Sequence, residues 1–256
     1  MNRKIFVGIP VRMASTRFPG KPVFPILGKT MMEHIYHRIN KNNLNKTVFF
    51  ALCDEQTRQE AVRLNAPYRD TNPNIERPIL RVAEAIKAYD CAKSDLVVIV
   101  QGDEPLVHPD MLEEALKPFF EENEPLCSCL CSEIDKEEAD DPNVIKIVKN
   151  LKGDCLYMSR NILPSTVHPE YNGKAKYLKQ VCIMAFTLST LTIFNSLPST
   201  NLEKAESIEL LRAIEHGYTV KMVETRYKSQ AVDTPADIET VEKILKLVAA
   251  PDNLNS

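Results

Sequence analysis

Short apolar runs alternate with amphipathic stretches along this chain. The runs are typical of buried strands, and apolar positions three or four residues apart predict helices. Strands are predicted over residues 4–9, 47–52, 95–100, 126–131, 144–149, 181–187 and 220–225. Helices are predicted over residues 31–40, 55–64, 79–89, 111–121, 190–195, 203–215 and 236–248.

Strands and helices alternate regularly over residues 1–120. This alternation predicts an α/β fold with a doubly wound, mainly parallel central sheet. After residue 151 the pattern becomes irregular, and residues 161–179, which include Pro164, Pro169 and Gly173, predict a long loop or lobe. The total of 256 residues suits one large domain or a domain with a small lobe.

A basic loop over residues 10–22 follows the first predicted strand. It contains no acid and three cations, which are Arg12, Arg17 and Lys21. Ser15 adds a hydroxyl donor, and Pro10 is one of three prolines that restrict the backbone. Fixed cations at the strand ends of an open α/β sheet favour a polyanionic ligand. An ordinary solvated basic turn is the alternative.

Two glycine-rich phosphate loops are excluded by the residues present. Gly28-Lys29-Thr30 ends like a Walker A loop, but Val23 stands where the first glycine is required. The dinucleotide fingerprint fails because Pro10 follows Gly8 two residues later. Phosphate binding by the basic loop would therefore rest mainly on side-chain cations.

An acidic element follows the predicted strand over residues 95–100. That strand runs into Gln101, Gly102 and Asp103, so Asp103 falls at the carboxyl end of a central strand, where α/β folds bind ligands. Mg²⁺ prefers one or two carboxylates together with substrate phosphate oxygens. Asp103 is therefore a candidate magnesium ligand, and a turn with an N-capping acid is the alternative.

A third element, Val232 to Asp237, precedes the last predicted helix. Asp233 or Thr234 is placed to cap that helix, with Pro235 in its first turn. Capping is the favoured interpretation for Thr234 and Asp237. Asp233 lies just before the cap and is a second candidate for the ligand crevice.

Composition excludes several classes of partner. The net charge of −3 argues against nucleic acid, and no apolar run reaches the ~20 residues of a membrane span. Cys127, Cys129 and Cys131 alternate along one predicted strand, which indicates a packed strand face rather than a zinc site. The odd number of seven cysteines and the lack of a signal peptide predict a reducing, cytoplasmic location.

The three elements together resemble the sugar-acid cytidylyltransferases, most closely the 3-deoxy-manno-octulosonate (Kdo) cytidylyltransferases, or CMP-Kdo synthetases. The family's opening motif, roughly Pro-Ala-Arg-x-x-Ser-x-Arg-x-Pro-Gly-Lys-Pro, matches residues 10–22 with Val11 in place of alanine. Its Gln-Gly-Asp-x-Pro motif matches residues 101–105, and Val-Asp-Thr-Pro matches residues 232–235. Weaker matches fall at residues 141–146, 157–164 and 202–212.

The resemblance implies a Rossmann-like nucleotidyltransferase fold. It implies a single domain over residues 1–248, a lobe over 155–215 for sugar-acid binding and dimerisation, and a tail over 249–256. The implied activity is Mg²⁺-dependent transfer of CMP from CTP to a Kdo-like sugar acid, with release of pyrophosphate, for synthesis of lipopolysaccharide or another cell-surface polysaccharide. CTP and the sugar acid are the implied partners, and the protein is implied to be a homodimer.

The resemblance also assigns roles to residues of this chain. It assigns catalysis to Lys21, Arg12, Asp103 and Asp233, and magnesium to Asp103 and Asp233. The nucleotide is assigned to Pro10, Arg12, Ser15, Arg17, Lys21, Gln101 and Gly102. The sugar acid is assigned to Ser159, Arg160, Gln180, Glu206 and Glu209. A structural ion pair is the alternative for Arg160, and a solvated acidic face is the alternative for Glu203, Glu206 and Glu209.

Two segments depart from the family pattern. Residues 75–81 replace the family's His-x-Ser-Gly-Thr-Asp/Glu-Arg segment, which lies near the nucleotide base, with one that contains a proline and two bulky aliphatic residues. Gln180 replaces a histidine, and Met184 and Phe186 replace two tyrosines. Because exchanged hydrogen-bonding groups change specificity, these swaps predict altered base reading or an altered acceptor.

Two other functions therefore remain open. One is a related nucleotidyltransferase that uses a different sugar acid, a phosphonate acceptor or another nucleotide. The other is a catalytically silent paralogue that binds nucleotide and serves in regulation or assembly. A silent paralogue would be expected to have lost a metal carboxylate or the lysine, whereas Asp103, Asp233 and Lys21 are all present.

Overall fold

The structure is a computed structural model that describes residues 3–15, 17–121, 123–168, 170 and 174–249. It has a mixed α/β fold with a large, mostly parallel sheet, which confirms the fold class predicted from the sequence. The chain divides into two compact units. Unit 1 comprises Met1–Phe6, Tyr89–Ile99 and Met111–Tyr227, and unit 2 comprises Val7–Ala88, Val100–Asp110 and Lys228–Ser256.

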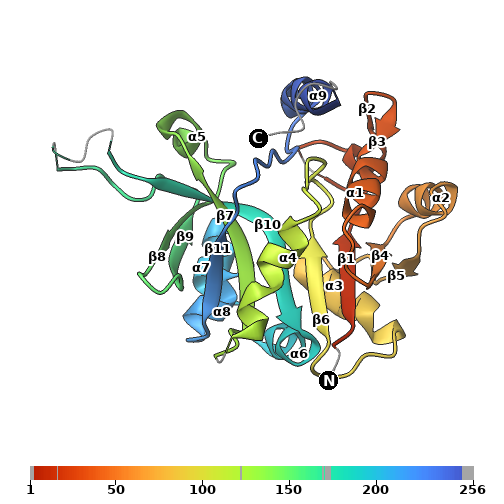
Figure 1. Cartoon of the computed structure of the whole chain (residues 1–256), viewed down its shortest axis with the longest axis horizontal. Helices are drawn as coiled ribbons and strands as arrows, with labels where there is room; N and C mark the ends of the chain where they lie inside the picture. Colours follow the sequence, from red (N-terminus) through yellow and green to blue (C-terminus); the bar gives the residue numbers. More distant parts are fainter. Residues whose placement is uncertain (1–2, 16, 122, 169, 171–173, 250–256) are drawn as a thin grey trace. The chain divides into compact units, whose positions relative to one another are not determined.

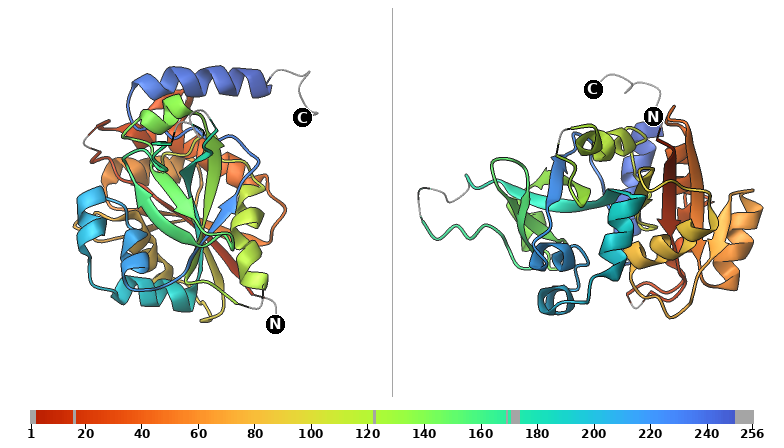
Figure 2. Two further views of the ribbon diagram at one scale, coloured as in Figure 1. Left: turned by 90° about the vertical axis from the view of Figure 1, so that its left-hand side faces the viewer. Right: turned by 90° about the horizontal axis from the view of Figure 1, so that it is seen from below.

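Unit 2 carries the basic loop and both candidate metal carboxylates. Strands β1, β4 and β5 lie side by side in it, and β4 and β5 run parallel (Figure 1). Its elements are β1 (Ile5–Pro10, beginning in unit 1), a 3₁₀ turn (Lys21–Val23), β2 (Pro25–Ile26), β3 (Lys29–Thr30), α1 (Met31–Asn40), β4 (Lys46–Leu52), α2 (Glu55–Arg63), β5 (Tyr68–Asp70), α3 (Pro78–Ala85), a second 3₁₀ turn (Ile86–Ala88) and α9 (Ala236–Ala249). Figure 2 shows α9 as one unbroken helix.

Local sequence explains where the first helix of unit 2 begins and which face it buries. The Thr30 side chain accepts a hydrogen bond from the Glu33 amide at 3.1 Å, which caps α1. Apolar residues at helical spacing, among them Met31, Ile35 and Ile39, are fully buried. The predicted bounds of this helix are confirmed.

Unit 1 contains strands in the order β11-β7-β10-β6, with the β8–β9 pair attached to β10. Strand β7 pairs in parallel with β11 and antiparallel with β10. Its elements are β6 (Leu96–Val100), α4 (Met111–Leu116), a 3₁₀ turn (Lys117–Phe120), β7 (Cys127–Ile134), α5 (Lys136–Asp140), β8 (Lys146–Lys149), β9 (Cys155–Ser159), β10 (Tyr177–Thr187), α6 (Leu188–Ser196), α7 (Asn201–Glu206), α8 (Leu211–Glu215) and β11 (Val220–Glu224).

The predicted helix over residues 203–215 is wrong. Ser207 adopts a left-handed conformation with φ of 55°, and its amide bonds the carbonyl of Glu203, which ends α7. A second helix, α8, begins only at Leu211. The short elements β2, β3, β5, α5 and β9 were not predicted, because two to five residues carry too little periodicity.

Other predicted bounds shift by a few residues. The predicted loop over 161–179 is shorter, since β10 begins at Tyr177, and its residues 169 and 171–173 lie outside the described residues. The predicted tail is likewise shorter, since Ala249 ends α9, and residues 250–256 are not described.

The cysteine-bearing strand forms a packed face, as predicted. Cys127, Cys129 and Cys131 are fully buried, and burial raises the pKa of the Cys131 thiol to about 12. All seven cysteines are free thiols. Within the described part of the chain, no helix is both long and apolar enough to cross a membrane.

Candidate active site

The basic loop is anchored to the neighbouring strand β4 and to Asp54, the residue that caps α2. The Val11 amide donates to the Ala51 carbonyl at 3.1 Å, which extends the ladder beyond β1. The Met13 amide donates to a carboxylate oxygen of Asp54 at 2.9 Å, and the Gly20 amide donates back to the Met13 carbonyl at 3.2 Å. These contacts hold the two ends of the loop together immediately before Lys21.

Close packing at Gly102 brings the acidic turn, residues 101–105, against the basic loop of residues 10–22. A Cβ atom at this position would lie 2.4 Å from Cγ1 of Val11 and 2.7 Å from the Pro10 carbonyl oxygen. Because the second of these is backbone, any side chain at Gly102 would force the two segments apart. Glycine therefore sets the distance between the first loop and Asp103.

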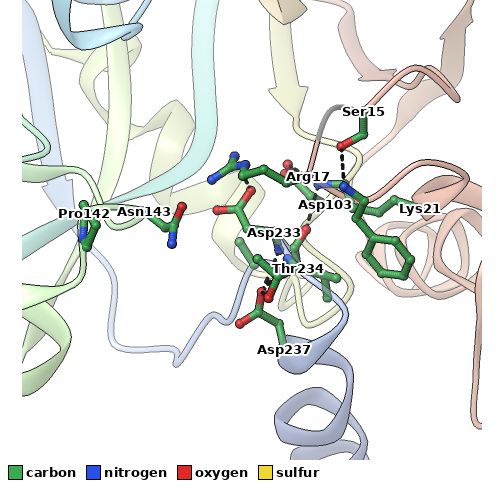
Figure 3. A network of polar contacts seen from close by, with 12 residues as sticks. Ser15, Arg17, Lys21, Asp103, Pro142, Asn143, Asp233, Thr234 and Asp237 are labelled. Atoms are coloured by element: carbon green, nitrogen blue, oxygen red, sulfur yellow. Dashed lines mark hydrogen bonds and ion pairs between the residues drawn. The ribbon is translucent and has the colours of Figure 1, made fainter.

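Lys21 joins the acidic turn to the C-terminal segment, residues 229–233, which precedes α9 (Figure 3). Its ammonium group donates to Oδ2 of Asp103 at 3.0 Å and to the Val232 carbonyl at 2.7 Å. The Val232 amide donates in turn to the Asp103 carbonyl at 2.9 Å. The Lys21 and Asp103 side chains are only 12% and 23% exposed, so water screens this ion pair little.

A second ion pair lies beside the first. The Arg17 guanidinium contacts Oδ1 of Asp233 at 2.7 Å. Burial raises the pKa of Asp233 above its ordinary value, and the charge of Asp103 raises it further, while Lys21 and Arg17 act in the opposite direction. The charges of Asp103 and Asp233 therefore repel each other, and Lys21 and Arg17 offset that repulsion.

The start of α9 fixes the backbone around Asp233. The Asp237 carboxylate accepts hydrogen bonds from the Asp233 amide at 2.9 Å and from the Thr234 amide at 2.7 Å. The Thr234 hydroxyl also donates to it, at 3.0 Å. The stabilising carboxylate at this helix start therefore belongs to Asp237, as favoured from the sequence, whereas the Thr234 hydroxyl donates to that carboxylate and the Asp233 side chain pairs with Arg17.

The two carboxylates have the chemistry of a magnesium site completed by substrate. Oδ1 of Asp103 is buried and has no hydrogen-bond partner. The described residues include no group of three or more histidine, cysteine or acidic side chains arranged to hold a metal. Mg²⁺ commonly takes one or two carboxylates and completes its shell with water and phosphate oxygens. Asp103 and Asp233 therefore fit Mg²⁺ bound together with a phosphate ligand.

The remaining predicted nucleotide residues also lie in unit 2. Pro10 ends β1, and the Ser15 hydroxyl accepts from the Phe18 amide at 3.4 Å. Arg12 is half-buried. Burial of Arg81 lowers the pKa of Arg81, and the charge of Arg12 lowers it further. Gln101 is half-buried between β6 and Gly102. The structure thus gathers all predicted phosphate and metal residues in one unit.

The candidate sugar-acid residues lie in unit 1, and Glu206 bonds two of them, Ser159 and Arg160, together with Tyr157. Its carboxylate accepts hydrogen bonds from the Tyr157 hydroxyl at 3.2 Å, the Ser159 hydroxyl at 2.7 Å and the Arg160 amide at 2.9 Å. Burial alone would raise the pKa of Glu206, but these hydrogen bonds bring the pKa below its ordinary value. Glu206 therefore remains ionised and holds the end of β9 against α7.

Arg160 donates mainly to backbone carbonyls. Its Nε donates to Glu206 at 3.0 Å, and its Nη1 donates to Pro142 at 3.2 Å and Asn143 at 3.1 Å. Lys146, itself fully buried, donates to the Arg160 carbonyl at 2.6 Å. These contacts are structural, and a role for Arg160 in gripping a sugar-acid carboxylate stays a prediction.

Three other acidic or amide residues differ in their surroundings. Gln180 donates through Nε2 to the Cys129 sulfur at 3.5 Å, so its amide nitrogen contacts strand β7. Glu203 is fully buried and bonds Arg212 at 2.8 and 2.5 Å, so a solvated face is wrong for this residue. Glu209 is half-buried between α7 and α8, and its carbonyl accepts from the Arg212 amide at 3.1 Å.

Comparison with known proteins decides the family. The chain matches the cytidylyltransferase family over residues 7–226. It belongs to that family. The 3-deoxy-manno-octulosonate cytidylyltransferase of Solibacter usitatus (strain Ellin6076) is 36% identical to it over 247 residues, covering 96% of each chain. That of Geotalea uraniireducens (strain Rf4) is 38% identical over 252 residues, covering 95% of this chain and 99% of the relative.

A known structure agrees with this placement. A CMP:2-keto-3-deoxy-manno-octonic acid synthetase complexed with CTP superposes with a TM-score of 0.86 at 31% identity, covering 96% of this chain and 99% of the other. The resemblance identified in the sequence is confirmed. This cytidylyltransferase is a nucleotidyltransferase, as its motifs predict.

In this cytidylyltransferase, the segment that departs from the family motif, residues 75–81, is held in place by hydrogen bonds from Arg81. Arg81 is 2% exposed, and its guanidinium donates to the Thr71 hydroxyl at 2.5 Å and to the Ile75 carbonyl. Pro78 occupies the first turn of α3, where its missing amide hydrogen costs nothing. The segment that replaces Ser-Gly-Thr therefore forms the start of a helix.

Sequence reasoning missed several residues that shape these sites. Lys146, Arg212, Glu104 and Ser229 are buried polar side chains whose partners lie outside their own helix or strand. Glu104 follows Asp103 directly, and Lys146 and Arg212 lie in the weaker motif matches, but the sequence did not show what these side chains contact. Polar residues of this kind become visible only when their partners are known.

Proposed function

We propose that this cytidylyltransferase transfers CMP from CTP to a 3-deoxy-manno-octulosonate-like sugar acid and releases pyrophosphate, with Mg²⁺ as cofactor. The product would serve the synthesis of lipopolysaccharide or another cell-surface polysaccharide. The observation that carries the proposal is the double pairing of Lys21 with Asp103 and of Arg17 with Asp233. Near-full-length relatives named as Kdo cytidylyltransferases support the choice of acceptor.

The paired charges suit nucleotidyl transfer because both partners can exchange. Transfer at phosphorus depends mainly on positioning and on neutralising phosphate charge. Lys21 and Arg17 can leave their carboxylates and bind triphosphate oxygens, with Arg12 as a third cation. Bound Mg²⁺ would supply the positive charge that Asp103 and Asp233 then lack. Pro10, Ser15, Gln101 and Gly102 would line the nucleotide.

The acceptor would be held by residues of unit 1. Ser159, Arg160, Gln180, Glu206 and Glu209 are the residues that we propose for this role. Glu206 is the strongest of them, because it is ionised and organises the end of β9. The attacking group is a sugar-acid hydroxyl, and pyrophosphate leaves from the α-phosphorus.

We further propose that the enzyme is a homodimer in the cytoplasm. Seven free thiols support a reducing compartment. Light scattering behind size-exclusion chromatography would test the dimer, and a mass of one chain would contradict it.

A second candidate is the same transfer with a different acceptor or nucleotide. Two observations favour it: Pro78 begins a helix where the family has Ser-Gly-Thr, and the Gln180 amide contacts the Cys129 sulfur. The two candidates share the phosphate and metal residues, so only substrates separate them.

Pyrophosphate release with Mg²⁺ tests both candidates. CTP, UTP, ATP and GTP would each be combined with Kdo, its 8-amino analogue, a nonulosonic acid and a simple phosphonate. Release with CTP and Kdo supports the first candidate, and release only with another pair supports the second. Silence across the panel, with CTP binding intact, would favour a catalytically silent protein.

A further inference from the structure

A buried hydrogen bond lies directly next to the candidate metal carboxylates. Glu104 follows Asp103 and is 2% exposed, and Ser229 is 8% exposed. The Ser229 hydroxyl donates to Oε2 of Glu104, across 125 positions of sequence. Burying a carboxylate is costly unless it is hydrogen-bonded, so this contact stabilises Glu104 in its buried position.

Two further polar links join the same two segments. The Val232 amide donates to the Asp103 carbonyl at 2.9 Å. Lys21 bridges Oδ2 of Asp103 and the Val232 carbonyl. Residues 101–105 and 229–233 are therefore joined by a backbone bond, by a lysine, and by the Glu104–Ser229 pair.

The three links differ in what happens to them when nucleotide binds. Under the proposed function, Lys21 turns to the triphosphate and its bridge is lost. The backbone bond and the buried Glu104–Ser229 bond involve none of the cationic groups that we propose to bind phosphate. They would then hold Asp103 and Asp233 together against the repulsion of their charges.

We propose that Glu104 and Ser229 are positioning residues that set the separation of Asp103 and Asp233 for a shared divalent cation. This inference rests on the proposed function, because that function supplies the cation and the triphosphate. Neither residue touches the reacting atoms. They act through the backbone of the two segments that carry the carboxylates.

Binding of Mn²⁺ in the presence of CTP, measured by electron paramagnetic resonance, tests the proposal without turnover. Ser229→Ala should weaken Mn²⁺ binding about tenfold, because it removes a hydrogen bond to a charged group. Ser229→Thr keeps the hydroxyl and should bind within about twofold of wild type. Ser196→Ala is the matched control, since it removes a serine bond to the Ile193 carbonyl in unit 1.

Kinetics separate positioning from general structural damage. With CTP saturating, Ser229→Ala should need about tenfold more metal for half-maximal rate, while the KM for the sugar acid stays unchanged. Should Ser229→Ala fail to fold, Glu104→Asp carries the same test. It keeps the charge but withdraws the carboxylate from Ser229, and it should weaken Mn²⁺ binding to a similar degree.

Unchanged Mn²⁺ binding in Ser229→Ala or Glu104→Asp would overturn the proposal, and so would equal weakening in Ser229→Ala and Ser229→Thr. A wild-type protein that binds no Mn²⁺ with CTP would also overturn it. Strong Mn²⁺ binding without pyrophosphate release from any acceptor would overturn the proposed function instead. The two failures are therefore distinguishable.

Discussion

Replacing Lys21 by alanine should destabilise the nucleotide-free protein. The substitution removes the ammonium group that bonds Oδ2 of Asp103 and the Val232 carbonyl. Oδ1 of Asp103 is already buried without a hydrogen-bond partner. The carboxylate would therefore lose its Oδ2 contact as well, and the acidic turn would lose one link to the C-terminal segment.

The size of the effect follows from the burial of the pair. Removing one partner of a buried ion pair costs about 3–5 kcal/mol, whereas exposed pairs are worth about 0–1 kcal/mol. The Lys21 and Asp103 side chains are 12% and 23% exposed, so we discount the buried value for partial solvation. We expect a loss of about 2 kcal/mol in the free energy of unfolding, which corresponds to a fall of ~4–8 °C in Tm for a chain of this size.

Thermal unfolding followed by circular dichroism, without nucleotide, measures this loss. Lys29→Ala is the matched control, because Lys29 is 54% exposed and approaches Glu33 only to 3.9 Å. Mg²⁺ should raise the Tm of Lys21→Ala more than that of the wild type, since Asp103 then regains a cation. A Tm for Lys21→Ala equal to that of Lys29→Ala would refute the reasoning.

Further predictions concern the carboxylates and the thiols. Asp103→Asn and Asp233→Asn should each abolish pyrophosphate release with unchanged circular dichroism, and full activity in either would count against a two-carboxylate metal site. Glu203→Gln should lower the free energy of unfolding by about 3 kcal/mol, because it breaks a buried pair with Arg212. Burial opposes ionisation of Glu203, but its hydrogen bonds, first that from Arg212, bring its pKa below the ordinary 4.5. The ionised Glu203 therefore stabilises the folded protein fully above pH 4.5. This contribution is lost as the pH falls through the lower pKa of the folded state. Urea unfolding below about pH 5 should therefore lose less stability per pH unit in Glu203→Gln than in wild type, and parallel curves would contradict this. Iodoacetamide should leave Cys129 unmodified in the native protein, since burial raises its pKa well above the ordinary value, and rapid labelling there would show that β7 opens.

The fold class and most elements followed from the sequence because they depend on short-range patterns. The helix over Met31–Asn40 was predicted with its observed bounds, from its apolar spacing. The three motifs could be placed at strand or helix ends for the same reason, and Asp103 and Lys21 were identified as candidates on that basis. Strand, helix and cap preferences act within a few residues, so a single chain segment contains all the information that they need.

Tertiary structure decided which polar groups meet. Ser207 gave no local sign that it would break a helix, and the buried charge of Glu203 is neutralised by Arg212 on the next helix. The pairing of Asp103 with Lys21 depends on the close approach at Gly102. The direction of the Gln180 amide depends on the pairing of β10 with β7. Such contacts join residues on different helices, strands and loops, and their free energy comes from burial and charge pairing that no local pattern records.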